Sequence, residues 1–288
     1  MARAARIDAH MHFWRYSPAG YGWIDDRMAA LRRDFLPADA ERELRAAGID
    51  ACVAVQVRQT VAETEWLLEL AAAHPFIAGV VGWVDLQSPD LERQLKAVAG
   101  KPKLVGVRHI VQAEPDDFLR GKAFRDGVAS VARHGLAYDI LVYARQLPAA
   151  IDFAAALPDV RLVLDHLGKP DIRAGGYDAW RRDLDRLAAL PNVWAKVSGL
   201  VTEADWERWA VEDLHRYIHA ALDSFGPERL MIGSDWPVCT VAAGYRGVID
   251  LVCTAIADRP QAEREAMLGG TARRFWNRGD VSEWSRNV

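Results

Sequence analysis

The first apolar segment of the chain carries two histidines, His10 and His12, separated by one residue. Successive side chains of a β-strand point to opposite faces, so residues two apart lie on the same face. Two imidazoles placed side by side can hold a metal ion or donate hydrogen bonds to one substrate oxygen. A His-X-His run alone is not specific for either role, because it also occurs on ordinary surfaces.

Two later apolar segments also end in side chains suited to catalysis. One ends in Asp165 and His166, and the other, near the far end of the chain, ends in Asp235. Only one of two adjacent strand residues faces inward, and the alternation with the two preceding leucines favours His166 over Asp165. A structural alternative for Asp235 is that it caps the helix that would follow it.

Short apolar runs rich in Val, Leu, Ile and Ala alternate with longer segments of helical periodicity along the whole chain. Such continuous apolar runs are typical of parallel strands that are buried on both faces. The expected strands are 7–10, 51–57, 77–84, 104–110, 137–142, 161–166, 193–197 and 230–233. The expected helices are 37–48, 64–73, 90–99, 124–134, 147–156, 177–190, 206–225 and 241–257.

Eight β-then-α units predict an α/β protein with one closed (β/α)8 TIM barrel spanning residues 1–288 as a single domain. An open doubly wound sheet is the rival fold, but the first strand is not followed by a G-x-G-x-x-G motif. The first connection, residues 13–34, is long and rich in aromatic residues and glycine. Such a loop in a compact domain usually covers a site.

The carboxyl ends of the strands form the active-site face of a (β/α)8 barrel. Polar or aromatic residues close every expected strand, and beyond the three histidines and Asp235 they are Gln56, Arg58, Trp83, Asp85, Arg108, His109, Asp139, Tyr143, Lys196 and Ser198. Of two neighbours such as Arg108 and His109, one could instead be a buried partner of the site. So many functional side chains at the same end of successive strands indicate an enzyme.

Three motifs, His10–His12, Leu164–Pro170 and Gly233–Pro237, together with the tail Met267–Trp276, resemble the lactonase branch of the amidohydrolase superfamily. The resemblance spans nearly the whole chain and implies a distorted (β/α)8 barrel. It also implies that His10 and His12 are a metal-binding pair, and that His166 joins the metal or contacts the substrate carbonyl. By the same resemblance, Asp235 binds the metal and activates water.

The resemblance leaves the metal requirement open. Two-metal members of the superfamily use a bridging lysine at a middle strand, but no lysine ends the segments 104–110 or 137–142. We therefore expect one divalent ion or none, and zinc suits a set of three histidines and one aspartate. Some members of this branch work without a metal.

The expected substrate is a small lactone. The branch resemblance points to sugar-acid lactones such as L-fuconolactone, opened by water that Asp235 activates. Tryptophans 14, 23, 83 and 236 fall near the expected mouth and suit the faces of sugar rings. The expected substrate-binding residues are Trp14, Arg58, Arg108, His109, Tyr143, Lys196 and Trp236.

Other activities stay open at this point. They are hydrolysis of a 2-pyrone-4,6-dicarboxylate-type lactone, metal-dependent decarboxylation of an aromatic acid, hydrolysis of another ester or amide, and ligand binding without catalysis. A dicarboxylate needs a cluster of arginines, and only Arg58 and Arg108 can be placed at the expected mouth.

The bulk properties are those of an ordinary globular protein with a net charge of −4 and no apolar stretch of membrane-spanning length. They favour neither nucleic acid nor a membrane as a partner. The three cysteines are odd in number and lack metal spacing, which indicates reduced thiols and a cytoplasmic protein. The sequence does not reveal the oligomeric state.

Overall fold

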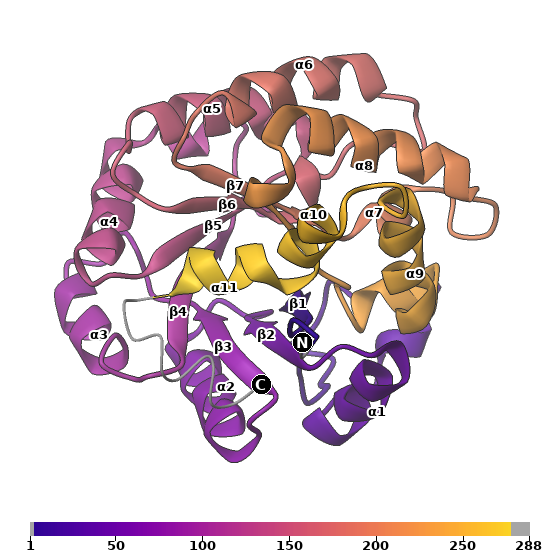
Figure 1. Ribbon diagram of the computed structural model, residues 1–288. Helices are drawn as coiled ribbons and strands as arrows, with labels where there is room; N and C mark the ends of the chain where they lie inside the picture. Colours follow the sequence, from indigo (N-terminus) through magenta and orange to yellow (C-terminus); the bar gives the residue numbers. More distant parts are fainter. Residues whose placement is uncertain (1–2, 278–288) are drawn as a thin grey trace.

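Eight parallel strands form one continuous sheet in which each strand pairs with the next along the chain. The computed structural model describes residues 3–277 and places helices around this sheet (Figure 1). The strands are β1 (Ile7–Met11), β2 (Ala51–Val55), β3 (Ile77–Gly82), β4 (Leu104–Ile110), β5 (Ala137–Leu141), β6 (Leu162–Leu164), β7 (Val193–Val197) and β8 (Leu230–Ile232). The predicted (β/α)8 barrel is confirmed, and five of the strands end one or two residues earlier than expected.

The sheet closes through the residues that follow its short last strand. Met11 of β1 forms a parallel bridge with Trp236. On either side of this bridge, the His12 amide donates to the Trp236 carbonyl at 2.7 Å, and the Asp235 amide donates to the His10 carbonyl at 2.9 Å. The same seam that closes the barrel therefore brings the two ends of the sequence, with their histidines and aspartate, side by side.

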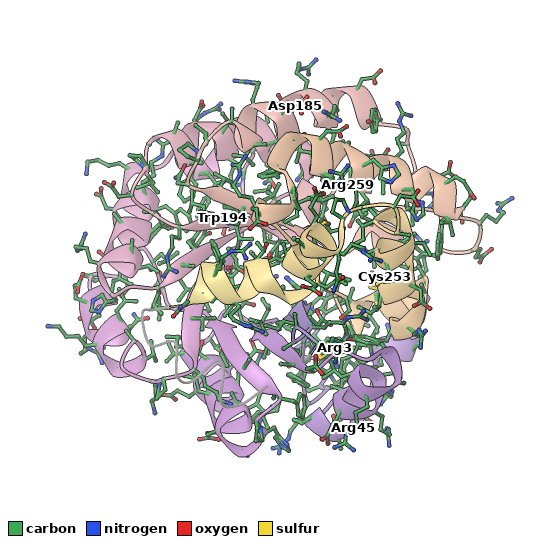
Figure 2. All side chains as sticks on the ribbon, in the orientation of Figure 1. Arg3, Arg45, Asp185, Trp194, Cys253 and Arg259 are labelled. Atoms are coloured by element: carbon green, nitrogen blue, oxygen red, sulfur yellow. The ribbon has the colours of Figure 1, made fainter. Side chains whose placement is uncertain are left out.

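The helices cover the outside of the barrel and leave charged side chains such as Arg45 and Asp185 at its rim (Figure 2). They are α1 (Pro37–Ala47), α2 (Val61–Ala73), α3 (Leu91–Val98), α4 (Lys122–Arg133), α5 (Leu147–Ala155), α6 (Tyr177–Ala188), α7 (Leu200–Glu203), α8 (Val211–Phe225), α9 (Tyr245–Ala255), α10 (Gln261–Glu265) and α11 (Thr271–Trp276). Shorter helical turns are η1 (Asp26–Leu31), η2 (Val111–Ala113), η3 (Phe118–Arg120), η4 (Ala144–Gln146), η5 (Asp165–Gly168), η6 (Pro227–Arg229), η7 (Val238–Val241) and η8 (Ala266–Gly270). No helix within residues 3–277 is both long and apolar enough to cross a membrane.

The helix expected over residues 206–225 is shorter than predicted. It begins at Val211, and the Asp205 carboxylate instead accepts a hydrogen bond from the Glu207 amide. Such a side-chain bond gives the backbone an alternative to the helix, which explains why apolar periodicity alone placed the start too early. The short helix α7 occupies the connection between β7 and this point.

Helix α11 closes the amino-terminal end of the barrel. In Figure 1 it lies across the strands, and its residues Phe275 and Trp276 belong to the cluster of buried apolar side chains that also holds Ile7 and Val53. The carboxyl ends of the strands, opposite α11, are left for polar side chains.

The aromatic first connection is anchored on the seam of the barrel. Trp14 and Phe35 pair with each other through two backbone hydrogen bonds of 3.0 and 2.9 Å. The Phe35 ring packs edge-on against Trp236 at 5.3 Å between centroids. The loop therefore lies next to Asp235, as its length and composition led us to expect.

Candidate active site

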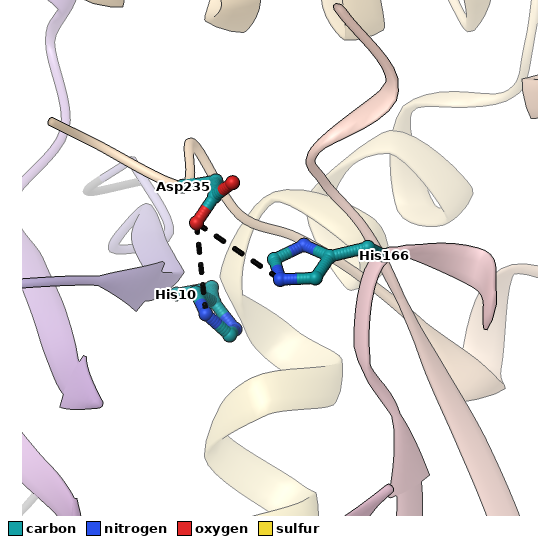
Figure 3. Close-up of side chains that lie close together, drawn as sticks. All are labelled: His10, His166 and Asp235. Carbon is teal, nitrogen blue, oxygen red and sulfur yellow. Dashed lines mark ion pairs between the residues drawn. The ribbon is translucent and has the colours of Figure 1, made fainter. Parts of the chain in front are cut away.

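Three histidines and one aspartate converge at the carboxyl end of the barrel. The Nε2 atom of His12 lies 3.2 Å from His10 Nε2 and 3.2 Å from Asp235 Oδ1. The same carboxylate oxygen lies 3.9 Å from Nε2 of both His10 and His166 (Figure 3). Each of these four residues is at most 4% exposed. Of the residues predicted from the sequence, these four are the ones that meet at a single point.

Hydrogen bonds at the outer nitrogens orient the rings of His12 and His166. His12 Nδ1 lies 2.8 Å from the carbonyl oxygen of Val55. A carbonyl can only accept, so this nitrogen carries the hydrogen and the Nε2 atom of the neutral ring is an acceptor. His166 Nδ1 contacts the hydroxyl of Ser198 at 2.9 Å, which leaves its Nε2 directed at Asp235.

The environment keeps the two most buried imidazoles neutral and the carboxyl group ionised. Burial lowers the pKa of His166 to about 4 and that of His10 well below its ordinary value. Burial alone would raise the pKa of Asp235, but the neighbouring His166, His12 and His10 outweigh it and hold the pKa below the ordinary value. At neutral pH the cluster therefore presents lone pairs and a negative charge.

This donor set fits one divalent metal ion. Nitrogen and oxygen atoms of His10, His166 and Asp235 lie within 4.8 Å of one another. The His12 lone pair faces the Asp235 carboxylate at 3.2 Å, and two acceptors at this distance need a cation or a proton between them. Neutral imidazoles whose outer N–H groups are hydrogen-bonded, beside one carboxylate, are the ligands that zinc prefers.

A left-handed turn brings both Asp165 and His166 into the site. The sequence prediction assumed a strand that continues to His166, but β6 ends at Leu164. His166 and Leu167 then adopt φ angles of 53° and 51°. Strand alternation does not apply to this turn, so the expectation that only one of the two residues would face inward was wrong. Both are buried, and Asp165 faces His10 while His166 faces Asp235.

A network of buried charges lies behind His10. Lys196 donates to Asp139 and approaches Asp165 Oδ1 at 2.9 Å, and its Nζ lies 3.2 Å from His10 Nδ1. Arg108 donates to the other oxygen of Asp165 at 2.9 Å. Burial raises the pKa of Asp139 to about 7, whereas Lys196, His10 and Arg108 overcome burial and lower the pKa of Asp165. The network fixes the position of the His10 ring.

Lys196 and Arg108 thus have protein partners rather than open access to a substrate. Lys196 is fully buried, and its Nζ also lies 5.3 Å from the centre of the Trp276 ring at the closed end of the barrel. Arg108 is 3% exposed, donates to the Gln56 carbonyl and lies 3.2 Å from His10 Nε2. The structure therefore places Lys196 on the Nδ1 side of His10, away from the point where the histidines meet, and Arg108 against His10 Nε2, the nitrogen that faces this point.

Two of the four predicted tryptophans, Trp14 and Trp236, are buried between the loop and the seam, whereas Trp23 is 44% exposed. Trp14 is fully buried and its indole donates to the Arg33 carbonyl at 2.9 Å, so its face is not available for stacking on a sugar. Trp236 is 3% exposed and packs against Phe13 and Phe35. Both rings therefore contribute to the apolar core between the loop and the seam. Composition alone could not distinguish this packing role from stacking on a sugar ring.

The remaining predicted residues lie at the rim of the site. Arg58 is exposed, and His109 is half-buried between Glu114, at 3.0 Å, and the indole of Trp83, at 3.4 Å. Tyr143 is half-buried and follows β5. Arg58 and Tyr143 stand on the loops after β2 and β5, and His109 is the last but one residue of β4, so all three lie at the same end of the barrel as the histidines.

The sequence prediction missed Glu63 in helix α2. Its Oε2 atom accepts hydrogen bonds from the amides of Val57 and Arg58 and thereby shapes the loop after β2. Its other carboxylate oxygen is buried and has no hydrogen-bond partner among the described residues. A glutamate early in a helix reads as an ordinary favourable charge, so the sequence held no indication of burial.

Glu63→Gln is expected to stabilise the protein at pH 8 by about 1–3 kcal/mol, because burial raises the pKa of Glu63 to about 7. The folded state then binds more protons than the unfolded state between about pH 4.5 and 7, so wild-type stability falls as the pH rises through this window. Urea unfolding of both proteins at pH 4.5 and 8 measures the difference. The amide should give little gain at pH 4.5, and an equal gain at both pH values would contradict this explanation.

The comparisons with known proteins agree with this geometry. The family model described as "Amidohydrolase" matches residues 7–278. An L-fucono-1,5-lactonase of Burkholderia multivorans is 46% identical over 95% of this chain and 96% of its own length. A second L-fucono-1,5-lactonase, from Burkholderia ambifaria, is 39% identical over 94% and 95%.

Solved structures show the same likeness. An amidohydrolase from Burkholderia multivorans with bound zinc superposes with a TM-score of 0.92 at 45% identity and covers 95% of this chain and 99% of its own. A probable 2-pyrone-4,6-dicarboxylic acid hydrolase from Acinetobacter baumannii, 18% identical with a TM-score of 0.74 over 94% of this chain and 98% of its own, shares the fold. With a barrel of eight parallel strands and a family match over nearly its whole length, this chain belongs to the amidohydrolase family.

Proposed function

We propose that the protein hydrolyses a sugar-acid lactone, with L-fucono-1,5-lactone as the first candidate. The observation that carries this proposal is the convergence of His10, His12, His166 and Asp235 at one buried point. The two relatives named L-fucono-1,5-lactonase, at 46% and 39% identity over nearly the whole chain, support the choice of substrate.

Asp235 acts as the general base in this mechanism. Its pKa lies below the ordinary value, so the carboxylate is ionised at neutral pH and can accept a proton from water. The water oxygen adds to the lactone carbonyl carbon, and the ring C–O bond then breaks. Asp235 returns the proton to the departing ring oxygen, which becomes the hydroxyl group of the product.

The imidazoles orient the reacting groups and would hold the metal. His10, His12 and His166 with Asp235 are the residues that would bind one divalent ion, with zinc as the first choice. When bound, such an ion supplies positive charge that polarises the lactone carbonyl. The Val55 carbonyl and the Ser198 hydroxyl keep the rings of His12 and His166 turned toward this point.

The rim of the site favours a neutral sugar lactone over a dicarboxylate. Recognition of two carboxylates needs several free guanidinium groups. Arg108 is engaged by Asp165 and Gln56, and among the two arginines predicted for the mouth only Arg58 is exposed. This distribution of positive charge supports a substrate that carries hydroxyl groups.

A pH-indicator assay over a panel of substrates tests the proposed function. The panel contains L-fucono-1,5-lactone, a five-membered sugar lactone, 2-pyrone-4,6-dicarboxylate and an aromatic acid, each with and without added zinc. We expect enzyme-dependent proton release from the sugar lactones. Opening of the dicarboxylate alone, or carbon dioxide release from the aromatic acid alone, would assign the site to another reaction.

Zinc is expected to raise the melting temperature of chelator-treated protein by several degrees. An ion that binds only the folded state adds about 2.7 kcal/mol of stability at a concentration one hundred times its Kd. Differential scanning calorimetry with and without zinc measures the shift, and His166→Ala provides the matched variant, which should lose most of it. Equal shifts in both proteins would place the zinc elsewhere.

The state of the cysteines bears on the compartment in which the protein works. Cys52 and Cys239 are buried free thiols, and Cys253 is a half-buried one. We propose that the chain works in the cytoplasm as one domain over residues 1–288, since reduced cysteines are usual there.

A further inference from the structure

Three loops at the carboxyl end of the barrel bring together Lys169, Glu203 and Tyr143. Lys169 follows the left-handed turn after β6, Glu203 ends helix α7 after β7, and Tyr143 follows β5. The mechanism above uses none of them. They lie in the connections that follow the neighbouring strands β5, β6 and β7, at the same end of the barrel as the histidine cluster.

Lys169 and Glu203 form an ion pair at the rim of the site. Their side chains are 16% and 18% exposed, and Lys169 Nζ lies 2.8 Å from Glu203 Oε1. The ammonium group also lies 5.8 Å from the centre of the Tyr143 ring. A ligand can reach an ion pair that is mostly buried but still partly exposed to solvent. It cannot reach a pair that is fully enclosed.

The backbone ties this pair to the catalytic cluster. The Lys169 amide donates to the His166 carbonyl at 2.9 Å, and the Arg173 amide donates to the Glu203 carbonyl at 3.1 Å. Burial lowers the pKa of Lys169, but Glu203 and Asp235 outweigh it and the net shift is upward. Lys169 is therefore a cation that lies close enough to Asp235 to feel its charge.

The pair has hydrogen-bonding capacity left for a ligand. An ammonium group has three donors, and the structure describes one hydrogen bond of Lys169 Nζ, the one to Glu203. Within residues 3–277, Glu203 Oε2 has no described side-chain partner, so it can accept from a hydroxyl group. The phenol of Tyr143 can donate and accept.

We propose that Lys169, Glu203 and Tyr143 form a subsite that binds the ring hydroxyl groups of the lactone and so selects a polyhydroxylated substrate. This inference rests on the proposed function and names the residues that distinguish a sugar-acid lactone from a lactone without hydroxyl groups. A vicinal diol matches the subsite, because one hydroxyl can donate to Glu203 while its neighbour accepts from Lys169.

The experiment compares two lactones with the same six-membered ring. L-Fucono-1,5-lactone carries the hydroxyl groups, and δ-valerolactone lacks them. The kinetic constants kcat and KM are measured for both with zinc-supplemented wild type, Lys169→Met, Glu203→Gln and Lys122→Met. Lys122 also pairs with a carboxylate, that of Asp126, but is 87% exposed on the outer helix α4, so its variant is the matched control.

We expect Lys169→Met and Glu203→Gln to lower kcat/KM for the sugar lactone by about 10- to 100-fold, the loss typical of a hydrogen bond to a charged group. Most of this loss should appear in KM, and it should exceed any loss on δ-valerolactone by at least tenfold. Where δ-valerolactone is too slow to measure, the division between KM and kcat decides. Lys122→Met should behave as wild type.

Three results would overturn the subsite. The first is sugar-lactone kinetics within threefold of wild type in both variants. The second is an equal loss of kcat/KM on both lactones, and the third is a loss confined to kcat. Either of the last two would mean that the pair only supports the catalytic cluster. Failure of the proposed function looks different, because the wild type itself would then open neither lactone, and the subsite would fall with it.

Discussion

Asp235→Asn is expected to lower kcat for lactone opening by a factor of about 10²–10⁴, the contribution usual for a general base. The amide keeps the shape of the side chain but has no site that accepts a proton from water at neutral pH. The backbone position is demanding, since Asp235 has a φ angle of 58°, and asparagine is among the few residues that tolerate this region. The fold should therefore survive, and initial rates of proton release measure the loss.

Two controls separate chemistry from disruption of the site. Circular dichroism and the melting temperature should show that Asp235→Asn is folded. Zinc binding by calorimetry should reveal whether the lost carboxylate also weakens the metal site. Turnover within tenfold of wild type would remove Asp235 from the role of base.

Lys196→Met is expected to destabilise the protein by about 3–5 kcal/mol, because it leaves the buried Asp139 without a cation and Asp165 with Arg108 alone. Asp139 and Asp165 are both fully buried and both contact Lys196 Nζ. The midpoint and slope of urea unfolding measure the change. The double variant Lys196→Met/Asp139→Asn should recover part of the loss, since it removes one unpaired charge.

Lys122→Met is the matched comparison for this effect as well. It removes the same ammonium group from an exposed ion pair, for which we expect a change within about 0.5 kcal/mol. If Lys196→Met lowered the free energy of unfolding by less than about 1 kcal/mol, this would contradict the view that the network behind His10 is a paired assembly of buried charges.

The fold could be predicted from the sequence because its signals are local and repeated. Continuous apolar runs identified all eight strands, and β4 and β7 were predicted with their observed bounds. Helix starts depend instead on single hydrogen bonds, such as that of Asp205, and periodicity does not reveal them.

The convergence of the histidines with Asp235 could also be anticipated, because parallel strands in a barrel end at one face. The roles of their neighbours could not. Lys196 and Arg108 end strands as substrate-binding residues would, but only the packing of Asp139 and Asp165 against them shows that they hold His10 in place. The left-handed turn at His166 and Leu167 could not be predicted either, because residues other than glycine seldom adopt positive φ angles.

The rate at which the purified, zinc-supplemented protein opens L-fucono-1,5-lactone tests the central claim most directly. The assay follows proton release with the spontaneous reaction subtracted. We predict saturable release of one proton per lactone, with a rate that is proportional to enzyme concentration. A rate no greater than that of buffer, in protein shown to be folded, would contradict the assignment of lactone hydrolysis to the cluster of His10, His12, His166 and Asp235.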